Sequence, residues 1–403
     1  MYGWEFPPNF SGGLGIACYG IVQGMLTNQI EVALVLPWNP TQSKYQTDGF
    51  KSINVPFSIT SIHSLLKPYM DEKQYQAQLI MDDLAHVTEF MHYGDNLMTE
   101  VRRYAALASQ QAAHVPHDMI HAHDWLTILA GIEARRLSGK PLVFQVHALE
   151  IDRSGEALNQ EVFDIEQYGL QEADHIIAVS QYTKNRIIER YGVAADKITV
   201  AYNGLFRHQH PKKHAVMASK NSLKTILFLG RLTYQKGVFY FIEAARSILA
   251  KRNDIQFVIA GEGDLLSSAI EQVASLKLGT HIHFTYFLDR EAVSKIYHQS
   301  DVYVMPSVSE PFGIACLEAL EHHVPVIISN QSGVAEVLDC MMTVDFWDTD
   351  ALEKKIIALI DQPEIREHLL SNIDEKLDQL TWNKLTQSII AAYEHLAQRE
   401  IIL

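Results

Sequence analysis

The stretch VYVMPSVSEPFGIACLEALEHH (residues 302–323) passes from an apolar run into a helical pattern through a Pro-Phe-Gly break. The apolar run 302–306 is typical of a buried strand, and 313–323 has helical spacing. Two carboxylates, Glu310 and Glu318, stand eight residues apart around the start of this helix. A solvated helix face would account for Glu318, but it does not account for the break after Glu310. The stretch therefore predicts a strand, a sharp turn and a helix, with acidic groups at the turn.

The same alternation of apolar run and helical pattern fills the C-terminal half. Strands are expected at 225–230, 255–261, 281–287, 302–306, 324–329 and 342–346, and helices at 238–252, 265–277, 291–300, 313–323, 333–338 and 350–360. Continuous apolar strands that alternate with amphipathic helices predict a parallel sheet covered on both faces. Right-handed crossovers make this half a doubly wound α/β domain.

The N-terminal half repeats the pattern less regularly. Strands are expected at 31–37, 119–123, 142–148, 175–180 and 198–203, and helices at 15–27, about 75–113, 126–137, 161–173 and 181–191. Any strand before the glycine loop at 9–20 is expected to be very short, unless the true start lies upstream. A polar segment without periodicity, 206–222, is interpreted as a linker. The sequence thus predicts two Rossmann-like domains, 1–205 and 206–381, whose strand ends can face one cleft.

Composition narrows the class of protein. A chain of 403 residues is too long for a single hydrophobic core, so two domains are expected. A composition of 47% hydrophobic and 20% charged residues is typical of a globular protein. The formal net charge of −15 argues against binding to a nucleic-acid backbone. Three cysteines without a C-x-x-C argue against a disulfide framework and favour a reducing cytoplasm. No apolar run reaches 18 residues, and the N-terminus lacks the basic region followed by an apolar region that is typical of a signal peptide. We therefore expect no transmembrane segment, although peripheral membrane contact stays open.

Two motifs at expected strand ends could bind a diphosphate. In GRLTYQKG (230–237), Arg231 and Lys236 can converge above the sheet edge, where two fixed cations suit paired phosphate oxygens. The alternative is that both are solvated loop charges. In the opening stretch, Pro311 and Phe312 are expected to begin the helix. The backbone N–H groups of the next residues, Gly313, Ile314 and Ala315, then lie at its positive end.

The carboxylates of that stretch have separate expected roles. Glu310 precedes the helix and is expected to face the cleft, although it could instead act as a helix cap. Glu318 lies one turn past Ile314 on the same helix face, where it could accept hydrogen bonds from the vicinal hydroxyls of a ribose. A surface position is the alternative for Glu318.

Three N-terminal motifs are less specific. NFSGGLGIACYG (9–20) fails as a dinucleotide fingerprint because the third glycine position is Cys18, but its glycines still allow close backbone approach to a ligand. VHALEIDR (146–153) places His147 at a strand end, where it could bind a substrate hydroxyl or simply be buried. The H-x-H pattern in HAHDW (121–125) could indicate a metal site. We reject this interpretation because metal sites need three or four ligands and the motif lacks the further ones. The D-T-D at 348–350 is interpreted as a helix cap.

The ordered set of motifs resembles a known family. GRLTYQKG followed by SEPFGIACLE, together with the glycine loop, HAHDW, VHALEIDR, EADHIIAVS, YNG and AGEG, is similar to the large retaining glycosyltransferase family (group 1, family four) that includes glycogen synthases and sucrose synthases. The resemblance covers nearly the whole chain, and its E-x7-E element is the most specific part. It implies the GT-B fold, in which two Rossmann-like domains enclose a cleft.

The resemblance also implies roles for individual residues. Arg231 and Lys236 would hold the donor diphosphate, Glu310 would contact the donor sugar and Glu318 the ribose. The remaining donor-binding positions would be Gly13, Gly15, Gly313, Ile314 and Ala315, and His147 would touch the transferred sugar near its reacting carbon. The segment 382–398 resembles the final helices of the family, which places about 382–403 on the N-terminal domain.

Two departures from the family pattern stand out. Phe10 occupies the lysine position of bacterial glycogen synthases, which puts ADP-glucose-dependent glycogen synthesis in doubt. The usual N-G-V-D has become Asn203-Gly204-Leu205-Phe206, a change that could alter interdomain packing.

The expected function is a metal-independent, retaining hexosyltransferase without a cofactor. It would move a sugar from a UDP-, ADP- or GDP-sugar to a hydroxyl of a carbohydrate or glycolipid acceptor. No carboxylate can be assigned as a covalent nucleophile, so front-face attack is what the family implies. The alternatives are a GT-B epimerase or hydrolase of nucleotide sugars, a non-catalytic sugar-binding module and a metallohydrolase.

Overall fold

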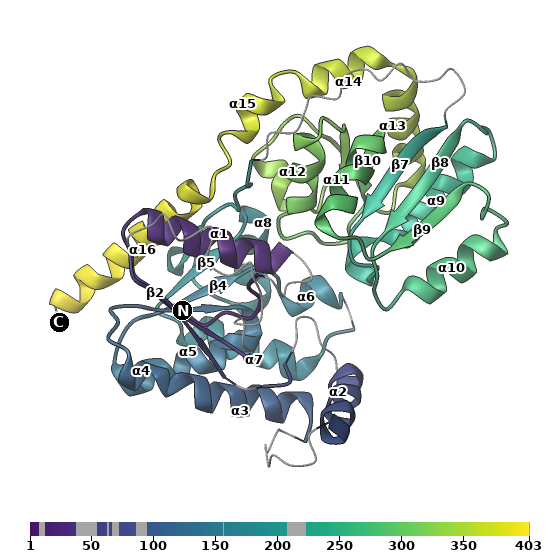
Figure 1. Cartoon of the computed structure of the whole chain (residues 1–403). Coiled ribbons are helices and arrows are strands. Elements are labelled where there is room, and N and C mark those ends of the chain that lie inside the picture. The colour runs from purple at the N-terminus through teal and green to yellow at the C-terminus, as the bar shows by residue number, and fades with distance from the viewer. Residues whose placement is uncertain are drawn as a thin grey trace.

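The computed structural model describes residues 1–7, 13–37, 55–62, 64–66, 72–85, 95–155, 157–207 and 223–402. Two lobes, each with a parallel sheet flanked by helices, make up the structure, as Figure 1 shows. The expected linker falls largely on 208–222, outside the described residues. The doubly wound α/β class predicted from the sequence is confirmed.

The C-terminal lobe contains one six-stranded parallel sheet in the order β12-β11-β10-β7-β8-β9. Its strands are β7 (Lys224–Leu229), β8 (Ile255–Ala260), β9 (Ile282–Tyr286), β10 (Val302–Met305), β11 (Val326–Ser329) and β12 (Met342–Val344). The order reverses direction between β7 and β10, and ligands of such sheets bind beyond the carboxyl ends of the strands at this switch point. The loops that follow β7 and β10 are the ones that carry Arg231 and Glu310.

Helices cover both faces of this sheet because both faces are apolar. The helices are α9 (Val238–Leu249), α10 (Leu266–Ser275), α11 (Arg290–Gln299), α12 (Ile314–Glu321) and α13 (Thr349–Asp361). One core, which includes Phe228 and Phe241, lies under α9 and α13, and the other, which includes Tyr303 and Leu317, lies under α12. Asp348 caps α13 by accepting a hydrogen bond from the Ala351 N–H at 2.9 Å, so the capping interpretation of the D-T-D is confirmed.

Three C-terminal elements differ from the sequence-based expectation. The helix expected at 333–338 is a single 3-10 turn, η4 (Gly333–Glu336). The helices α14 (Pro363–Leu370) and α15 (Ile373–Leu377) were not expected. All three elements are of eight residues or fewer, too short for hydrophobic periodicity to identify them.

In the N-terminal lobe, Tyr2 links two groups of strands. Its strands are β1 (Val32–Leu36), β2 (Phe57–Ser61), β3 (Ile120–His123), β4 (Leu142–Val146), β5 (His175–Ala178) and β6 (Ile198–Val200). Tyr2 bridges in parallel to Val35 in β1 and to Ala122 in β3, so it links the β1-β2 pair to the β3-β4-β5-β6 sheet. The first strand is thus very short, as expected. β2 was not expected, because it is an edge strand without a fully buried residue and so lacks an apolar run.

The helices of this lobe follow the expected positions with two changes. They are α1 (Gly13–Thr27), α2 (Glu72–Ala85), α3 (Leu97–Ser109), α4 (Gln111–His114), α5 (Asp124–Ser138), α6 (Glu150–Arg153), α7 (Gln160–Glu172) and α8 (Gln181–Tyr191). The single helix expected at about 75–113 consists of α2, α3 and α4 in the described residues, and the Asn96 side chain caps α3. The second change is α6, which has only four residues and gives no periodic signal.

The long final helix α16 (Trp382–Ile402) runs beside α1 on the N-terminal lobe (Figure 1). The contact is close because two glycines of α1 face it. A Cβ atom added at Gly20 would lie 2.1 Å from the Trp382 ring, and one added at Gly24 would lie 2.0 Å from Thr386 Oγ1. The helices can approach this closely only while both positions lack a side chain.

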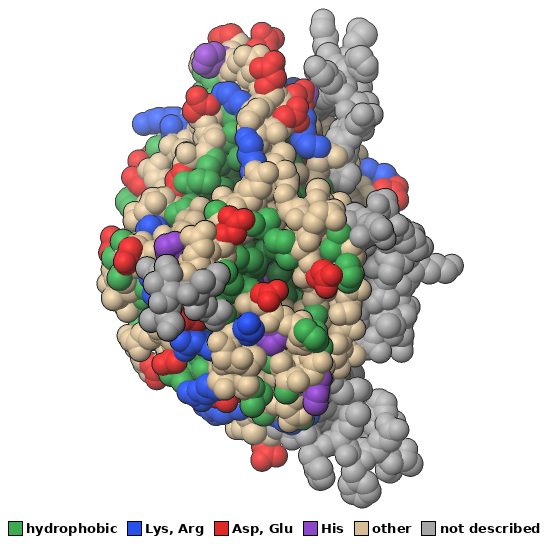
Figure 2. Space-filling model, turned by 90° about the vertical axis from the view of Figure 1, so that its left-hand side faces the viewer, with side chains coloured by type: hydrophobic (Ala, Val, Ile, Leu, Met, Phe, Trp, Pro, Cys, Tyr) green, Lys and Arg blue, Asp and Glu red, His purple; other side chains and the backbone are tan. Residues whose placement is uncertain are grey.

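The surface carries side chains of every class. On the face shown in Figure 2, hydrophobic side chains gather around a central hollow, and acidic and basic side chains are scattered around it. Among the described residues, no helix combines the length and the apolar character needed to cross a membrane. All three cysteines, Cys18, Cys316 and Cys340, are free thiols in the interior.

We expect Gly20→Ala to destabilise the protein although Ala is the better helix former. In an isolated helix this change is favourable by about 1 kcal/mol. Here the new methyl group would overlap the Trp382 ring, so we expect the free energy of unfolding to fall by roughly 1–3 kcal/mol, measured by urea denaturation. In the control, Gly279→Ala, the added Cβ meets no atom within 4 Å. A Gly20→Ala protein as stable as wild type would contradict the proposed packing of α16 on α1.

Candidate active site

The loop that follows β7 is fixed to the loop that follows β10. Gly237 ends the 3-10 turn η3 (Tyr234–Lys236) with φ +71°, and a Cβ atom there would lie 2.0 Å from the carbonyl oxygen of Pro306. The Val308 N–H donates to the Gln235 carbonyl at 2.8 Å. These backbone contacts place Lys236 directly beside Glu310.

Lys236 and Glu310 form a largely buried ion pair. Lys236 Nζ lies 2.5 Å from Glu310 Oε2, and their side chains are 19% and 8% exposed. Ser307 Oγ donates to the same carboxylate oxygen at 3.3 Å. The Glu310 backbone is held as well, because its N–H donates to Gln331 and its carbonyl accepts from Gly333. The two residues, predicted separately for phosphate and sugar, therefore form one ion-paired unit.

Helix α12 begins at Ile314, not at Pro311 as the sequence predicted. Gly313 has φ +110° and turns the chain into the helix, and a Cβ atom there would crowd Met305, Glu310 and Val334 at 3.2–3.3 Å. No side chain caps this helix, so the N–H groups of its first turn point out of its positive end. The first turn includes Ile314 and Ala315, so both lie at the positive end of the helix, and their role in phosphate binding stays a prediction.

Glu318 lies on the same helix in a desolvated position. Tyr297 Oη donates to the Ala315 carbonyl at 3.0 Å and lies 3.4 Å from Glu318 Oε2. Burial raises the pKa of Glu318 from 4.5 to about 7, although the Tyr297 hydroxyl opposes this shift. This carboxyl group therefore keeps its proton to a higher pH than an exposed glutamate does.

Arg231 is half-buried just beyond β7, on a loop supported by the AGEG segment (260–263). Gly261 has φ +129°, and a Cβ atom there would lie 2.0 Å from the Gly230 carbonyl oxygen. The Leu232 N–H donates to the Glu262 carbonyl at 2.8 Å. The two strand-end loops thus hold each other, which fixes the backbone on both sides of Arg231.

On the N-terminal lobe, His147 lies one residue past β4 and is held by the HAHDW segment (121–125). Asp124 Oδ1 accepts the backbone N–H of His147 at 2.7 Å, and His123 Nδ1 lies 2.9 Å from His147 Nε2. Burial lowers the pKa of His147, and the Asp124 carboxylate opposes the shift. Within the described residues, no three His, Cys, Asp or Glu side chains are grouped as a metal site would require. Metal independence stays a prediction.

The glycine loop faces the C-terminal lobe through Gly13. A Cβ atom added at Gly13 would lie 3.6 Å from Ile314 Cδ1, so the first residue of α1 faces the start of α12. The N–H of Gly15 donates to the buried Glu5 carboxylate at 3.0 Å. This bond already occupies the amide predicted to approach a ligand. Phe10 and the rest of 8–12 lie outside the described residues.

A polar network joins the two lobes next to Glu310. Ser309 Oγ donates to Asp152 Oδ1 at 2.7 Å and lies 2.9 Å from Tyr182 Oη. Arg186 pairs with the same Asp152 oxygen at 2.9 Å. The network therefore fixes the residue before Glu310 against the N-terminal lobe.

A second contact between the lobes uses a helix end. The Glu336 carboxylate accepts the backbone N–H groups of Gln181 and Tyr182 at 2.7 and 2.6 Å, at the positive end of α8. Sequence reasoning missed these lobe-joining residues. Asp152 and Ser309 lie inside quoted motifs, but no motif marks Tyr182, Arg186 or Glu336.

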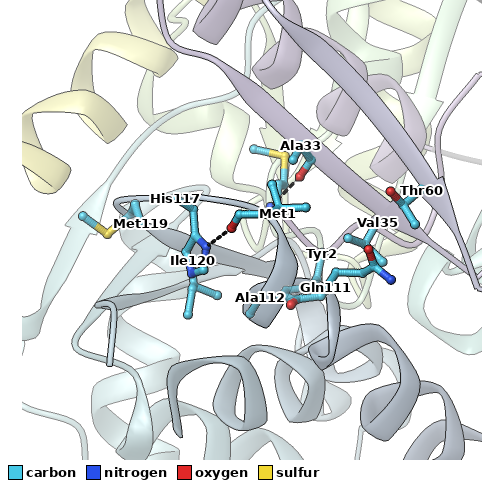
Figure 3. Close-up of a pocket in the computed structure, with 11 residues that line it drawn as sticks. Met1, Tyr2, Ala33, Val35, Thr60, Gln111, Ala112, His117, Met119 and Ile120 are labelled. Carbon is cyan, nitrogen blue, oxygen red and sulfur yellow. Dashed lines mark hydrogen bonds between the residues drawn. The ribbon is translucent and has the colours of Figure 1, made fainter. Parts of the chain in front are cut away.

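The pocket in Figure 3 is separate from these residues. It lies at the amino ends of β1 and β3, where the Met1 amino group donates to the Ala33 carbonyl at 2.8 Å. His117 and Ile120 also line it. His123 lies at the opposite, carboxyl end of β3, and His147 follows the carboxyl end of β4. The pocket is therefore not part of the candidate active site.

Comparison with known protein families matches both lobes. Residues 11–205 match the family described as Glycosyltransferase Family 4, and residues 209–376 match Glycosyl transferases group 1. An uncharacterized glycosyltransferase of Methanocaldococcus jannaschii is 25% identical over 415 residues, which cover 98% of this chain and 97% of that protein. Glycogen synthase of Mycobacterium tuberculosis is 28% identical over 343 residues, 84% of this chain and 79% of the relative.

Solved structures share the fold of the whole chain. Sucrose-phosphate synthase from Thermosynechococcus elongatus superposes with a TM-score of 0.74 at 18% identity, covering 98% of this chain and 95% of that one. Anabaena HepE in complex with UDP and glucose gives a TM-score of 0.70 at 17% identity and covers 98% of both chains. These likenesses confirm the predicted GT-B fold.

We expect Glu318 to make stability fall as pH rises. Between pH 4.5 and 7 the folded protein keeps a proton that the unfolded chain has released, so the stabilisation present below pH 4.5 is lost as the pH passes 7. Relative to Glu318→Gln, which cannot titrate, wild type should lose about 1–3 kcal/mol of unfolding free energy from pH 4.5 to 8. Urea denaturation at several pH values measures this difference. Parallel stability curves for the two proteins would contradict the raised pKa.

Proposed function

We propose that this GT-B glycosyltransferase, composed of a family 4 domain and a group 1 domain, is a retaining hexosyltransferase. It moves a sugar such as glucose from a nucleoside diphosphate to a hydroxyl of a carbohydrate or glycolipid acceptor. The observation that carries the proposal is the Lys236–Glu310 pair, which lies beside the uncapped end of α12 at the switch point of the sheet.

The donor diphosphate occupies the space between the cations and the helix. Arg231 and Lys236 supply fixed positive charge, and the N–H groups of Ile314 and Ala315 supply donors at a positive helix end. Glu318 accepts hydrogen bonds from the ribose hydroxyls. These groups match the two parts of a nucleoside diphosphate that lie beyond the base, the diphosphate and the ribose.

Arrival of the donor changes the Lys236–Glu310 pair. The diphosphate draws Lys236 toward itself, and Glu310 then accepts hydrogen bonds from hydroxyls of the donor sugar instead. The carboxylate stays in place during this exchange because Ser307 and the Glu310 backbone contacts hold it. Binding of the donor thus replaces one set of charged contacts with another and leaves no buried charge without a partner.

Departure of the nucleoside diphosphate is the difficult step. Negative charge grows on the leaving group as the anomeric carbon becomes cationic. Fixed donors and cations stabilise that charge without reorganising, and loss of one such group typically costs roughly 2.7–4 kcal/mol. The protein cations Arg231 and Lys236 take the place that a metal ion holds in other transferases, so neither a metal nor a cofactor is needed.

The proposed stereochemical outcome is retention. Glu310 is bound to Lys236 and Ser307, and we assign it to sugar binding, not to covalent attack. In the proposed mechanism the acceptor hydroxyl attacks from the face that the leaving group vacates, which keeps the anomeric configuration. His147, at the end of β4, hydrogen-bonds the transferred sugar near its reacting carbon.

Two of the relatives support a glucosyl donor. They are a glycogen synthase and an alpha-maltose-1-phosphate synthase of Mycolicibacterium smegmatis, the latter 27% identical over 310 residues, which cover 69% of this chain and 79% of that protein. The Anabaena structure with UDP and glucose supports the same class of donor.

Arg231→Ala and Lys236→Ala should each lower kcat/KM by roughly 100- to 1,000-fold, because each removes charge that stabilises the leaving group. Transfer from a nucleotide sugar measures the loss. Lys251→Ala is the matched control, since Lys251 forms an exposed ion pair with Glu353, in which the lysine side chain is 65% exposed.

Thermal melting of each variant shows whether the fold survives. This check matters most for Lys236→Ala, which leaves the Glu310 carboxylate buried without its cation. Turnover like that of wild type in a folded Arg231→Ala or Lys236→Ala protein would remove the proposed mechanism.

A panel of UDP-, ADP- and GDP-sugars should identify the donor. A tight ligand of the folded state raises the melting temperature, and 100 times its Kd stabilises by about 2.7 kcal/mol. Incubation of the preferred donor without an acceptor then tests the alternative activity, since a transferase should leave it largely intact. Rapid hydrolysis or epimerisation under these conditions would favour the nucleotide-sugar epimerase or hydrolase instead.

A further inference from the structure

Three histidine rings form a row that ends at the candidate active site. The rings of His121 and His123 stack with centroids 4.6 Å apart, and those of His123 and His147 with centroids 5.3 Å apart. His121 and His123 are two residues apart in β3, so they share one face of the sheet. His123 pairs in register with Gln145, two residues before His147 in the chain. Strand pairing therefore brings the HAHDW segment to His147.

His147 is held at two points by neighbouring residues of that segment. Asp124, whose φ is +56°, accepts the backbone N–H of His147 at 2.7 Å. The ring nitrogen Nε2 of His147 lies 2.9 Å from Nδ1 of His123, whose side chain is fully buried. Asp124 thus fixes the backbone of His147 while His123 fixes its ring.

The contacts also decide where the protons lie. Burial lowers the pKa of both His123 and His147, so each neutral ring carries a single N–H. Nε2 of His123 is buried without a hydrogen-bond partner among the described residues. A buried N–H without an acceptor is rarer than a bare acceptor atom. The proton of His123 therefore sits on Nδ1 and is donated to His147 Nε2, which leaves the proton of His147 on its own Nδ1.

We propose that His123 is a positioning residue that fixes the ring orientation and the tautomer of His147, so that His147 presents its Nδ1–H to the transferred sugar. This rests on the proposed function, in which His147 contacts that sugar. The proposal gives the HAHDW segment a role in orienting a sugar-binding group.

The far end of the row supplies a matched control. Tyr393 of α16 hydrogen-bonds Nδ1 of His121 at 2.5 Å. Tyr393→Phe removes a buried hydrogen bond from the same row, but it leaves the His123–His147 contact in place. If activity were lost merely because the row of histidines became less tightly held, the Tyr393→Phe variant would lose activity as well.

The kinetic test compares His123→Leu with His123→Asn. Leucine removes the hydrogen bond, whereas the asparagine amide nitrogen takes the place of Nδ1 and can still donate to His147. Misplacement of a reacting group by about 1 Å can cost roughly 100-fold. We expect His123→Leu to lower kcat by that order with little change in the donor KM. His123→Asn should recover most of the activity, and Tyr393→Phe should keep wild-type kcat.

A double-mutant cycle separates positioning from general destabilisation. If His123 acts only through His147, then His123→Leu should cost nothing further in a His147→Ala background. The same loss in both backgrounds, or equal kcat values for His123→Leu and wild type, would overturn the proposal. Equal activity of the Asn and Leu variants would overturn it as well.

A second readout does not depend on activity. The 15N chemical shifts of histidine ring nitrogens distinguish the two tautomers, and a His147→Gln variant assigns the His147 signals among the 19 histidines. We expect His147 to be protonated at Nδ1 in wild type and in His123→Asn, and to lose this preference in His123→Leu. Protonation at Nε2 in wild type would overturn the proposal. Absence of transfer from every donor, with the expected tautomer, would instead reject the proposed function alone.

Discussion

The buried ion pair between Lys236 and Glu310 sets the geometry of the cleft. Both side chains are largely buried, and a buried charge without a partner is costly. The ion pair therefore favours contact between the two loops that carry these residues. The sheet makes this contact possible, because β7 and β10 are neighbours in the sheet although residues 230–301 separate them in the chain. Gly237 and the Val308–Gln235 hydrogen bond then bring the loops together at atomic distance.

The same pair lies beside the contacts that join the two lobes. Ser309, the residue before Glu310, bonds to Asp152 of the N-terminal lobe, and Gly333, whose N–H donates to the Glu310 carbonyl, belongs to the turn that ends at Glu336. Glu336 in turn holds the start of α8. Glu310 is therefore joined through its backbone neighbours to the hydrogen bonds that hold the two lobes together.

Much of the fold could be predicted from the sequence because buried strands and amphipathic helices have distinct periodicities. All six strands of the C-terminal sheet lie where apolar runs predicted them. The pattern failed where an element has no buried run, as in the edge strand β2, or is too short for a period to appear, as in α6 and η4. It also placed the start of α12 three residues early, because the left-handed conformation of Gly313 is a property of the folded backbone.

The sequence by itself determined which cations, which carboxylates and which helix start follow the strands of the C-terminal sheet. Only the tertiary structure decided how these groups are paired. Lys236 with Glu310, His123 with His147, and Glu5 with the Gly15 amide are contacts between segments that no local pattern relates. The physical reason is that period and propensity act over a few neighbouring residues, whereas a buried polar group must find its partner wherever the packing of the sheets brings one.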